Sequence, residues 1–160
     1  PSVGLSLSME QSSLKCYMAD TGLLVSLAFA DDSKTAENVY RTVLRGELGI
    51  NEGMLTENVV AQMLVARGHH LFFYSQSGRA EGEERMEIDF LIQKPYEDAA
   101  GKPRISPIEV KSPRQYGTTS LDRFKKRFGK RIGVQYVLHP KQMKVEQGRV
   151  YLPLYMGMCL

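Results

Sequence analysis

Acidic residues occupy alternate positions at the start of one strand-like segment. This segment, residues 87–94, reads EIDFLIQK. Successive residues of a β-strand point to opposite faces of the sheet. The alternation therefore predicts that Glu87 and Asp89 share one face, while Ile88 and Phe90 share the other.

A second strand-like segment, residues 106–113, reads SPIEVKSP and carries an acid and a lysine at alternate positions. By the same alternation, Glu109 and Lys111 share a face, with Ile108 and Val110 on the opposite face. Two half-buried strands that turn charged residues toward the same side can build a site.

A further carboxylate lies in the segment with the clearest helical pattern. Residues 53–68 read GMLTENVVAQMLVARG, which is apolar around much of the helix circumference. Helical spacing puts Glu57 on one face with Val60, Ala61 and Leu64. A carboxylate on a packed face must be paired, hydrogen-bonded or bound to metal, because burying it bare costs free energy.

Carboxylates beside a lysine suit the hydrolysis of a phosphodiester bond. This reaction uses hard oxygen ligands to hold Mg²⁺ or Mn²⁺, which activates water and stabilises the leaving oxygen. A lysine places a compact positive charge beside the transition state. We therefore identify Asp89, Glu109 and Glu57 as candidate metal ligands. Lys111 is assigned to charge stabilisation or water positioning, so that all four residues are candidates for catalysis.

The elements that must position these residues follow from hydrophobic periodicity and turn residues. An extended segment is expected to enter a short helix capped by Asp20, followed by a second helix over residues 33–49. Beyond the helix of residues 53–68, the sequence predicts three strands, a helix with Ser120 as a plausible cap, and a fourth strand. These elements are expected over residues 69–76, 86–94, 104–112, 119–130 and 134–140, with a last short strand and an apolar tail after them.

Length and composition are those of one ordinary globular domain. The chain has 160 residues, of which 42% are hydrophobic, and no apolar segment approaches the roughly 20 residues of a membrane helix. Its two cysteines, Cys16 and Cys159, lie far apart and outside any CxxC motif, so both are expected to be reduced. We expect a cytoplasmic protein without a membrane partner. His139, at the end of a strand, is expected at the surface.

Positive charge is concentrated in one helical segment. The formal net charge is only +3, but six of the nine residues in RFKKRFGKR, residues 123–131, are basic. By default this is a solvated helix face, and its charge also suits a helix C-terminus. The alternative is contact with the phosphates of nucleic acid, in which Lys125, Lys126, Lys130 and the more distant Arg114 would take part.

The order of a helical acid, a strand aspartate and a Glu-x-Lys motif resembles the restriction-endonuclease-like superfamily, named PD-(D/E)XK after its motif. Asp89 matches the first acid, Glu109 to Lys111 match the (D/E)XK part, and Glu57 is similar to the helical acid of many members. Ile88 stands where the motif usually has proline. This resemblance implies a mixed central sheet flanked by helices.

A second resemblance covers most of the chain. The segments LKCYMADTGLL, LTENVVAQML, EIDFLI, PIEVKS, SLDRFKKRF and LPLYMGMCL look like successive landmarks of a C-terminal domain of unknown function in prokaryotic AAA-type ATPases. It implies that the chain is the C-terminal portion of a longer protein, and that the upstream ATPase domain of the same polypeptide is its partner. The chain itself has no GxxxxGK[ST] loop for nucleotide.

Together these observations predict a nuclease-like core over residues 51–160, with an N-terminal helical segment over residues 1–50 packed on it. The expected function is Mg²⁺-dependent hydrolysis of DNA under control of the ATPase. The alternatives are a catalytically silent module that binds DNA or protein, including a second copy of itself, and a structural cap for the ATPase. In these alternatives Asp89, Glu109 and Lys111 form only a structural network of lysine and carboxylates.

Overall fold

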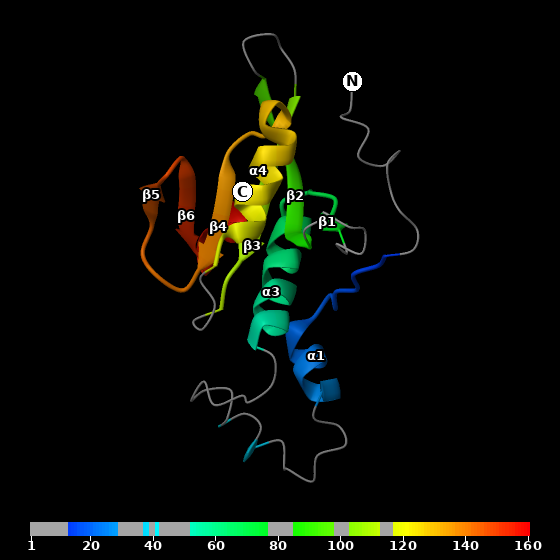
Figure 1. Cartoon of the computed structure of the whole chain (residues 1–160). Coiled ribbons are helices and arrows are strands. Elements are labelled where there is room, and N and C mark those ends of the chain that lie inside the picture. The colour runs from blue at the N-terminus through cyan, green and yellow to red at the C-terminus, as the bar shows by residue number, and fades with distance from the viewer. Residues whose placement is uncertain are drawn as a thin grey trace.

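The structure is a computed structural model that describes residues 13–28, 37–38, 41, 52–76, 85–97, 103–112 and 117–160. Most of the helix expected over residues 33–49 lies outside these residues, and the candidate contact Arg114 lies wholly outside them. The described elements run as follows along the chain (Figure 1). They are α1 (Thr21–Ala28), α3 (Glu52–Ala66), β1 (Phe72–Gln76), β2 (Met86–Glu97), β3 (Pro103–Val110), α4 (Thr119–Phe128), η2 (Gly129–Arg131), β4 (Gln135–His139), β5 (Lys144–Glu146), β6 (Arg149–Pro153) and η3 (Leu154–Cys159).

The described strands form a six-stranded mixed sheet in the order β1-β2-β3-β4-β6-β5. Strands β1, β2 and β3 are antiparallel neighbours, whereas β3 pairs with β4, and β4 with β6, in parallel. A parallel connection needs a crossover, and α4 provides it between β3 and β4. The expectation of an α/β fold with a mixed sheet is thus confirmed.

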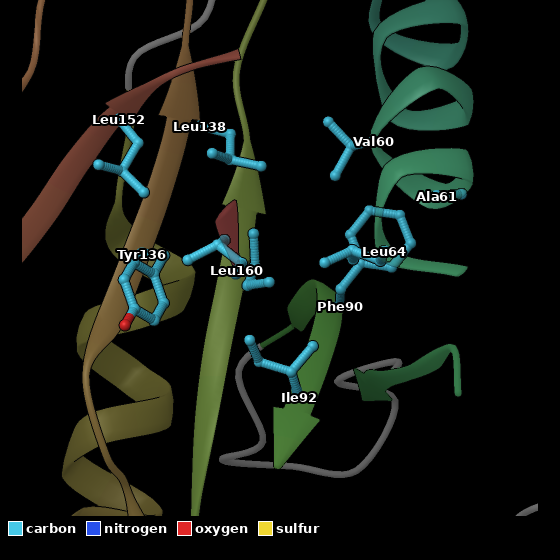
Figure 2. Packing of buried hydrophobic residues seen from close by; sticks show 10 residues of the cluster. Val60, Ala61, Leu64, Phe90, Ile92, Tyr136, Leu138, Leu152 and Leu160 are labelled. Atoms are coloured by element: carbon cyan, nitrogen blue, oxygen red, sulfur yellow. The ribbon is translucent and has the colours of Figure 1, made fainter. Parts of the chain in front are cut away.

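Helix α3 packs on one face of the sheet. Its buried residues Val60, Ala61 and Leu64 meet apolar side chains that point toward it from the strands and the C-terminus, as Figure 2 shows. These partners are Phe90, Ile92, Ile108, Tyr136, Leu138, Leu152 and Leu160. Gly68 follows the helix with a φ of +86°, a left-handed conformation that favours glycine and ends the helix where the sequence predicts.

Helix α4 packs on a second cluster, and Figure 2 shows it across the strands from α3. Leu121 and Phe124 are its buried residues, and Phe128 packs beside them as the sequence predicts. The expected cap at Ser120 is wrong, because the N-cap residue is Thr118 and its side chain makes no capping hydrogen bond. The remaining buried members of this cluster are Met86, Ile88, Leu91, Ile132 and Val137.

Residues 13–20 form an extended segment that lies along α3 and leads into α1 (Figure 1). Asp20 caps α1 as expected, since its Oδ1 accepts the backbone N–H of Leu23 at 2.8 Å. Asn58 of α3 holds the segment by accepting the backbone N–H of Met18 at 2.8 Å and donating to its carbonyl oxygen at 3.1 Å. Long-range polar contacts therefore fix where this segment lies.

Strand β2 contains a bulge that breaks the simple alternation of its residues. Phe72 of β1 pairs with Leu91, whereas Tyr74 pairs with Ile88, so β2 has one more residue than β1 in this interval. As a result Ile88 packs in the α4 cluster and Phe90 in the α3 cluster. The prediction that these two residues share a face is wrong, because an extra residue shifts the alternation on either side of it.

His139 also differs from expectation. The residue ends β4, but it is only 2% exposed. Its ring meets that of Tyr151 with centroids 5.7 Å apart.

Strand β5 was not predicted as a separate strand. It joins β6 through Gln147 and Gly148, both with positive φ, as in a two-residue hairpin turn.

Within the described residues, none of the helices is long and apolar enough to cross a membrane.

Candidate functional site

The candidate site lies where β2 and β3 separate. The paired part of these strands begins at Phe90 and Ile108. At the preceding position of β2, a side chain replaces the backbone as the hydrogen-bond partner of β3: Asp89 Oδ2 accepts the backbone N–H of Val110 at 2.8 Å. Asp89 is thereby held against the residue between Glu109 and Lys111.

Glu109 of β3 and Lys111, which directly follows β3, form a close ion pair on one side of this segment, as the alternation predicts. The distance between Lys111 Nζ and Glu109 Oε1 is 2.5 Å, and the two side chains are 12% and 8% exposed respectively. The other carboxylate oxygen, Glu109 Oε2, is buried and has no hydrogen-bond partner within the part of the chain that the structure describes. Burial raises the pKa of Glu109, although Lys111 opposes the rise by favouring the charged carboxylate.

Asp89 carries a strongly perturbed carboxylate. Burial, together with the like charges of Glu57 and Glu109, raises its pKa from 3.8 to about 6, while the Val110 N–H and Lys15 act in the opposite direction. A buried carboxylate whose ionised form is disfavoured in this way is typical of functional sites, although structural networks produce the same effect. The site therefore holds negative charge at a cost in free energy.

Glu57 meets a lysine and a tyrosine that sequence reasoning missed. Lys15, from the extended segment, places its Nζ 2.9 Å from Glu57 Oε1, 2.9 Å from Glu87 Oε1 and 3.7 Å from Asp89 Oδ1. Tyr17 donates its hydroxyl to the same Glu57 oxygen at 2.5 Å. Glu87, Asp89 and Glu57 are thus brought together around a single ammonium group.

The environment of Lys15 and Tyr17 keeps both groups protonated. Burial alone would lower the pKa of Lys15, but its hydrogen bonds to Glu87 and Glu57, together with the negative charges of Glu57 and Asp89, outweigh burial and raise the pKa. Burial, followed by the hydrogen bond to Glu57, raises the pKa of Tyr17. Alternation could have indicated that these two residues share one side of an extended segment, but nothing in the sequence names their partners.

Comparison with known families adds one finding. The family model for the domain of unknown function DUF4143 matches residues 52–156, more than half of the chain. The chain belongs to the DUF4143 family. No curated protein and no solved structure matches it. The DUF4143 match contains α3, the whole sheet and therefore Glu57, Asp89, Glu109 and Lys111, whereas Lys15 precedes it.

The donors in this DUF4143 domain suit a hard cation. They are carboxylate oxygens, one of them buried without a hydrogen-bond partner among the described residues, and two ammonium groups, those of Lys15 and Lys111, already lie beside them. As they stand, no three His, Cys, Asp or Glu side chains of the described residues are grouped so that they could hold a metal ion. A divalent cation would therefore require the side chains of Glu57, Asp89 and Glu109 to rearrange around it.

The predicted basic residues lie on the exposed side of α4. Lys125 and Lys126 are exposed on the helix, and Lys130 is exposed in the turn that follows it. Two other basic residues tie the helix to the edge of the sheet: Arg123 donates to the carbonyl oxygen of Arg85, and Arg127 donates to Gln76. The structure thus places positive charge on the helix that connects β3 to β4.

A buried arginine near the start of α4 was also missed by sequence reasoning. Arg149 of β6 is 4% exposed, and it donates hydrogen bonds to Gln135, Thr118 and Asp122. Its positive charge opposes the rise in the pKa of Glu109. Arg149 of β6 thus links the start of α4 to β4, so we assign it a structural role beside the site.

Proposed function

We propose that this chain is a nuclease-like domain of the restriction-endonuclease-like type, which hydrolyses phosphodiester bonds of DNA with the help of Mg²⁺ or Mn²⁺. The observation that carries the proposal is the separation of β2 and β3, where Asp89 is hydrogen-bonded between Glu109 and Lys111. An acid, a second acid and a lysine on neighbouring strands are the groups that this chemistry requires.

Each residue has a part that its surroundings support. Asp89 and Glu109 would hold the metal, since Glu109 is buried, the side chain of Asp89 is only 18% exposed, and Glu109 Oε2 has no hydrogen-bond partner among the described residues. Glu57 would assist from α3. When bound, the metal supplies a Lewis acid and activates water. Lys111 would present a positive charge to the phosphate, or position the attacking water.

The exposed lysines of α4 support DNA as the substrate class. Lys125, Lys126 and Lys130 are free to approach phosphates, and contacts of this kind do not depend on base sequence. In keeping with the resemblance to the C-terminal domain of AAA-type ATPases, we further propose that the domain works in the cytoplasm beside an ATPase module of the same polypeptide.

Metal binding tests the proposal first. Mn²⁺ titrated calorimetrically into the wild-type chain should bind, and the Asp89→Asn variant should lose this binding. Glu146→Gln is the matched control, because Glu146 is an exposed carboxylate on β5, at the far edge of the sheet. Binding that is equally strong in the wild type and in Asp89→Asn contradicts the proposed metal site.

Cleavage of DNA tests the chemistry. Lys111→Met should abolish Mg²⁺-dependent cleavage of plasmid and single-stranded DNA, with circular dichroism showing that the variant is folded. Lys144→Met is the control, because Lys144 forms a Lys-Glu pair of the same spacing with Glu146, but on the surface. Cleavage that survives both Lys111→Met and Asp89→Asn rules out the mechanism.

A second candidate function is a catalytically silent module that binds DNA or a protein. The observation in its favour is that lysines already accompany the carboxylates: Lys111 pairs with Glu109, and Lys15 pairs with Glu57 and Glu87. Such a network of paired charges needs no metal and no catalytic role. This candidate predicts that Mn²⁺ binds no better to the wild type than to Asp89→Asn, while the exposed lysines of α4 still retard DNA at low salt.

A further inference from the structure

The extended segment of residues 13–20 is held at a defined position on α3. Asn58, which is 2% exposed, makes two hydrogen bonds to the backbone of Met18 and donates a third to Thr21 Oγ1. Gln62 adds hydrogen bonds to the Met18 carbonyl and to Thr21 at 3.2 Å and 2.8 Å. Because this attachment lies three residues after Lys15, it brings the side chain of Lys15 to a fixed part of the site.

Lys15 occupies the position of a cation among the acids. Its side chain is 19% exposed, and its Nζ lies within 3 Å of carboxylate oxygens from Glu57 on α3 and Glu87 on β2. Asp89 Oδ1 lies 3.7 Å away. The same ammonium group also lies 5.6 Å from the centre of the Phe73 ring, which adds a favourable contact on another side.

We propose that Lys15 is the internal counter-ion of the metal site and controls its affinity, so that a divalent cation binds only when the ammonium group leaves Glu57 and Asp89. The inference rests on the proposed function, because it concerns the same carboxylates. Two features of the geometry support it. The Glu57 oxygen nearest Lys15 also accepts the Tyr17 hydroxyl, so it is already fully engaged. The Lys15 ammonium group also contacts both Glu57 and Asp89, the two carboxylates that a cation would have to join on this side of the site.

The consequence is a competition between two parts of the chain. With Lys15 in place, the segment of residues 13–20 is fixed and the acids are neutralised in part. With a divalent cation in place, Lys15 loses its partners and its ammonium group is released toward solvent or toward a phosphate. Any process that moves this segment away from α3 would increase the affinity of the acids for the metal.

Calorimetric titration with Mn²⁺ of the wild type and of Lys15→Met tests the competition, with Lys144→Met as a matched control. Methionine keeps the length of the side chain and removes the charge. Lys15→Met should bind Mn²⁺ at least tenfold more tightly than the wild type, and Lys144→Met should bind as the wild type does. Equal or weaker binding by Lys15→Met overturns the inference and leaves the proposed metal site standing. No binding by any of the three proteins overturns both.

A second pair of variants covers the case in which Lys15→Met is unfolded by repulsion among its acids. Glu87→Gln removes one of these negative charges, at a residue that is 41% exposed in its side chain. The double variant Lys15→Met, Glu87→Gln should bind Mn²⁺ at least tenfold more tightly than Glu87→Gln alone. Equal affinities in this pair overturn the inference.

Discussion

The burial of Asp89 makes a quantitative prediction about stability. Asp89→Asn removes the negative charge and keeps an oxygen that can accept the Val110 N–H. Because the surroundings favour the neutral form of Asp89, the substitution should stabilise the chain near neutral pH. The residue proposed to hold a metal is thus expected to weaken the fold that carries it.

The magnitude follows from the pKa of Asp89, which burial raises from 3.8 to about 6. Each pKa unit corresponds to about 1.4 kcal/mol, so ionised Asp89 costs the folded state about 3 kcal/mol at neutral pH. The folded state binds this proton more tightly than the unfolded state. Asp89 is protonated in both states well below its unfolded pKa of 3.8, so the cost is absent there; it develops as the pH rises through about 6 and is constant above that.

Urea unfolding followed by circular dichroism measures this effect. Asp89→Asn should raise the free energy of unfolding by about 2–3 kcal/mol at about pH 7.5 and leave it nearly unchanged at about pH 4. Asp122→Asn is the control of opposite sign, because it removes the carboxylate partner of the buried Arg149 and should destabilise the chain at about pH 7.5. A variant Asp89→Asn that is no more stable than the wild type at about pH 7.5, or equally stabilised at both pH values, refutes the reasoning.

Three further predictions concern contacts around the site. Lys111→Met should lower the free energy of unfolding by about 3 kcal/mol near neutral pH, because it leaves the buried Glu109 carboxylate unpaired. The surface variant Lys144→Met should show no measurable change. Equal losses for the two variants in urea unfolding would contradict this. Arg149→Met should cost about 3 kcal/mol through its lost hydrogen bonds, and a loss below about 1 kcal/mol would exclude the structural part assigned to it. Asn58→Ala should speed hydrogen exchange at the Met18 amide by at least about tenfold, and an unchanged rate would show that Asn58 does not hold the segment.

Much of the fold could be predicted because its signals are local. Helical spacing and Gly68 define α3 and its end, since a glycine at positive φ is a property of a few neighbouring residues. The alternation in SPIEVKSP places Glu109 and Lys111 on one side of the segment, and their ion pair at the end of β3 confirms it. Such predictions succeed where each residue's direction depends only on its own element.

The bulge in β2 and the burial of His139 depend instead on neighbouring strands. The sequence EIDF alternates regularly, and only the pairing of β2 with β1 shows that one residue is extra. His139 stands before a proline at the end of a strand, and residues in such positions are usually exposed. The structure leaves it only 2% exposed and packs its ring against Tyr151 of β6, a neighbour that only the order of the strands in the sheet brings beside it.

The sequence by itself determined the types and spacings of the charged residues in the candidate site, and with them the chemistry that can be proposed. Only the tertiary structure decided which charges meet. Lys15 and Glu57 are separated by 42 positions in the chain, yet they form a hydrogen bond of 2.9 Å. Their meeting depends on how the extended segment packs on α3, because a charged side chain takes whichever partner the packing of distant segments brings within reach.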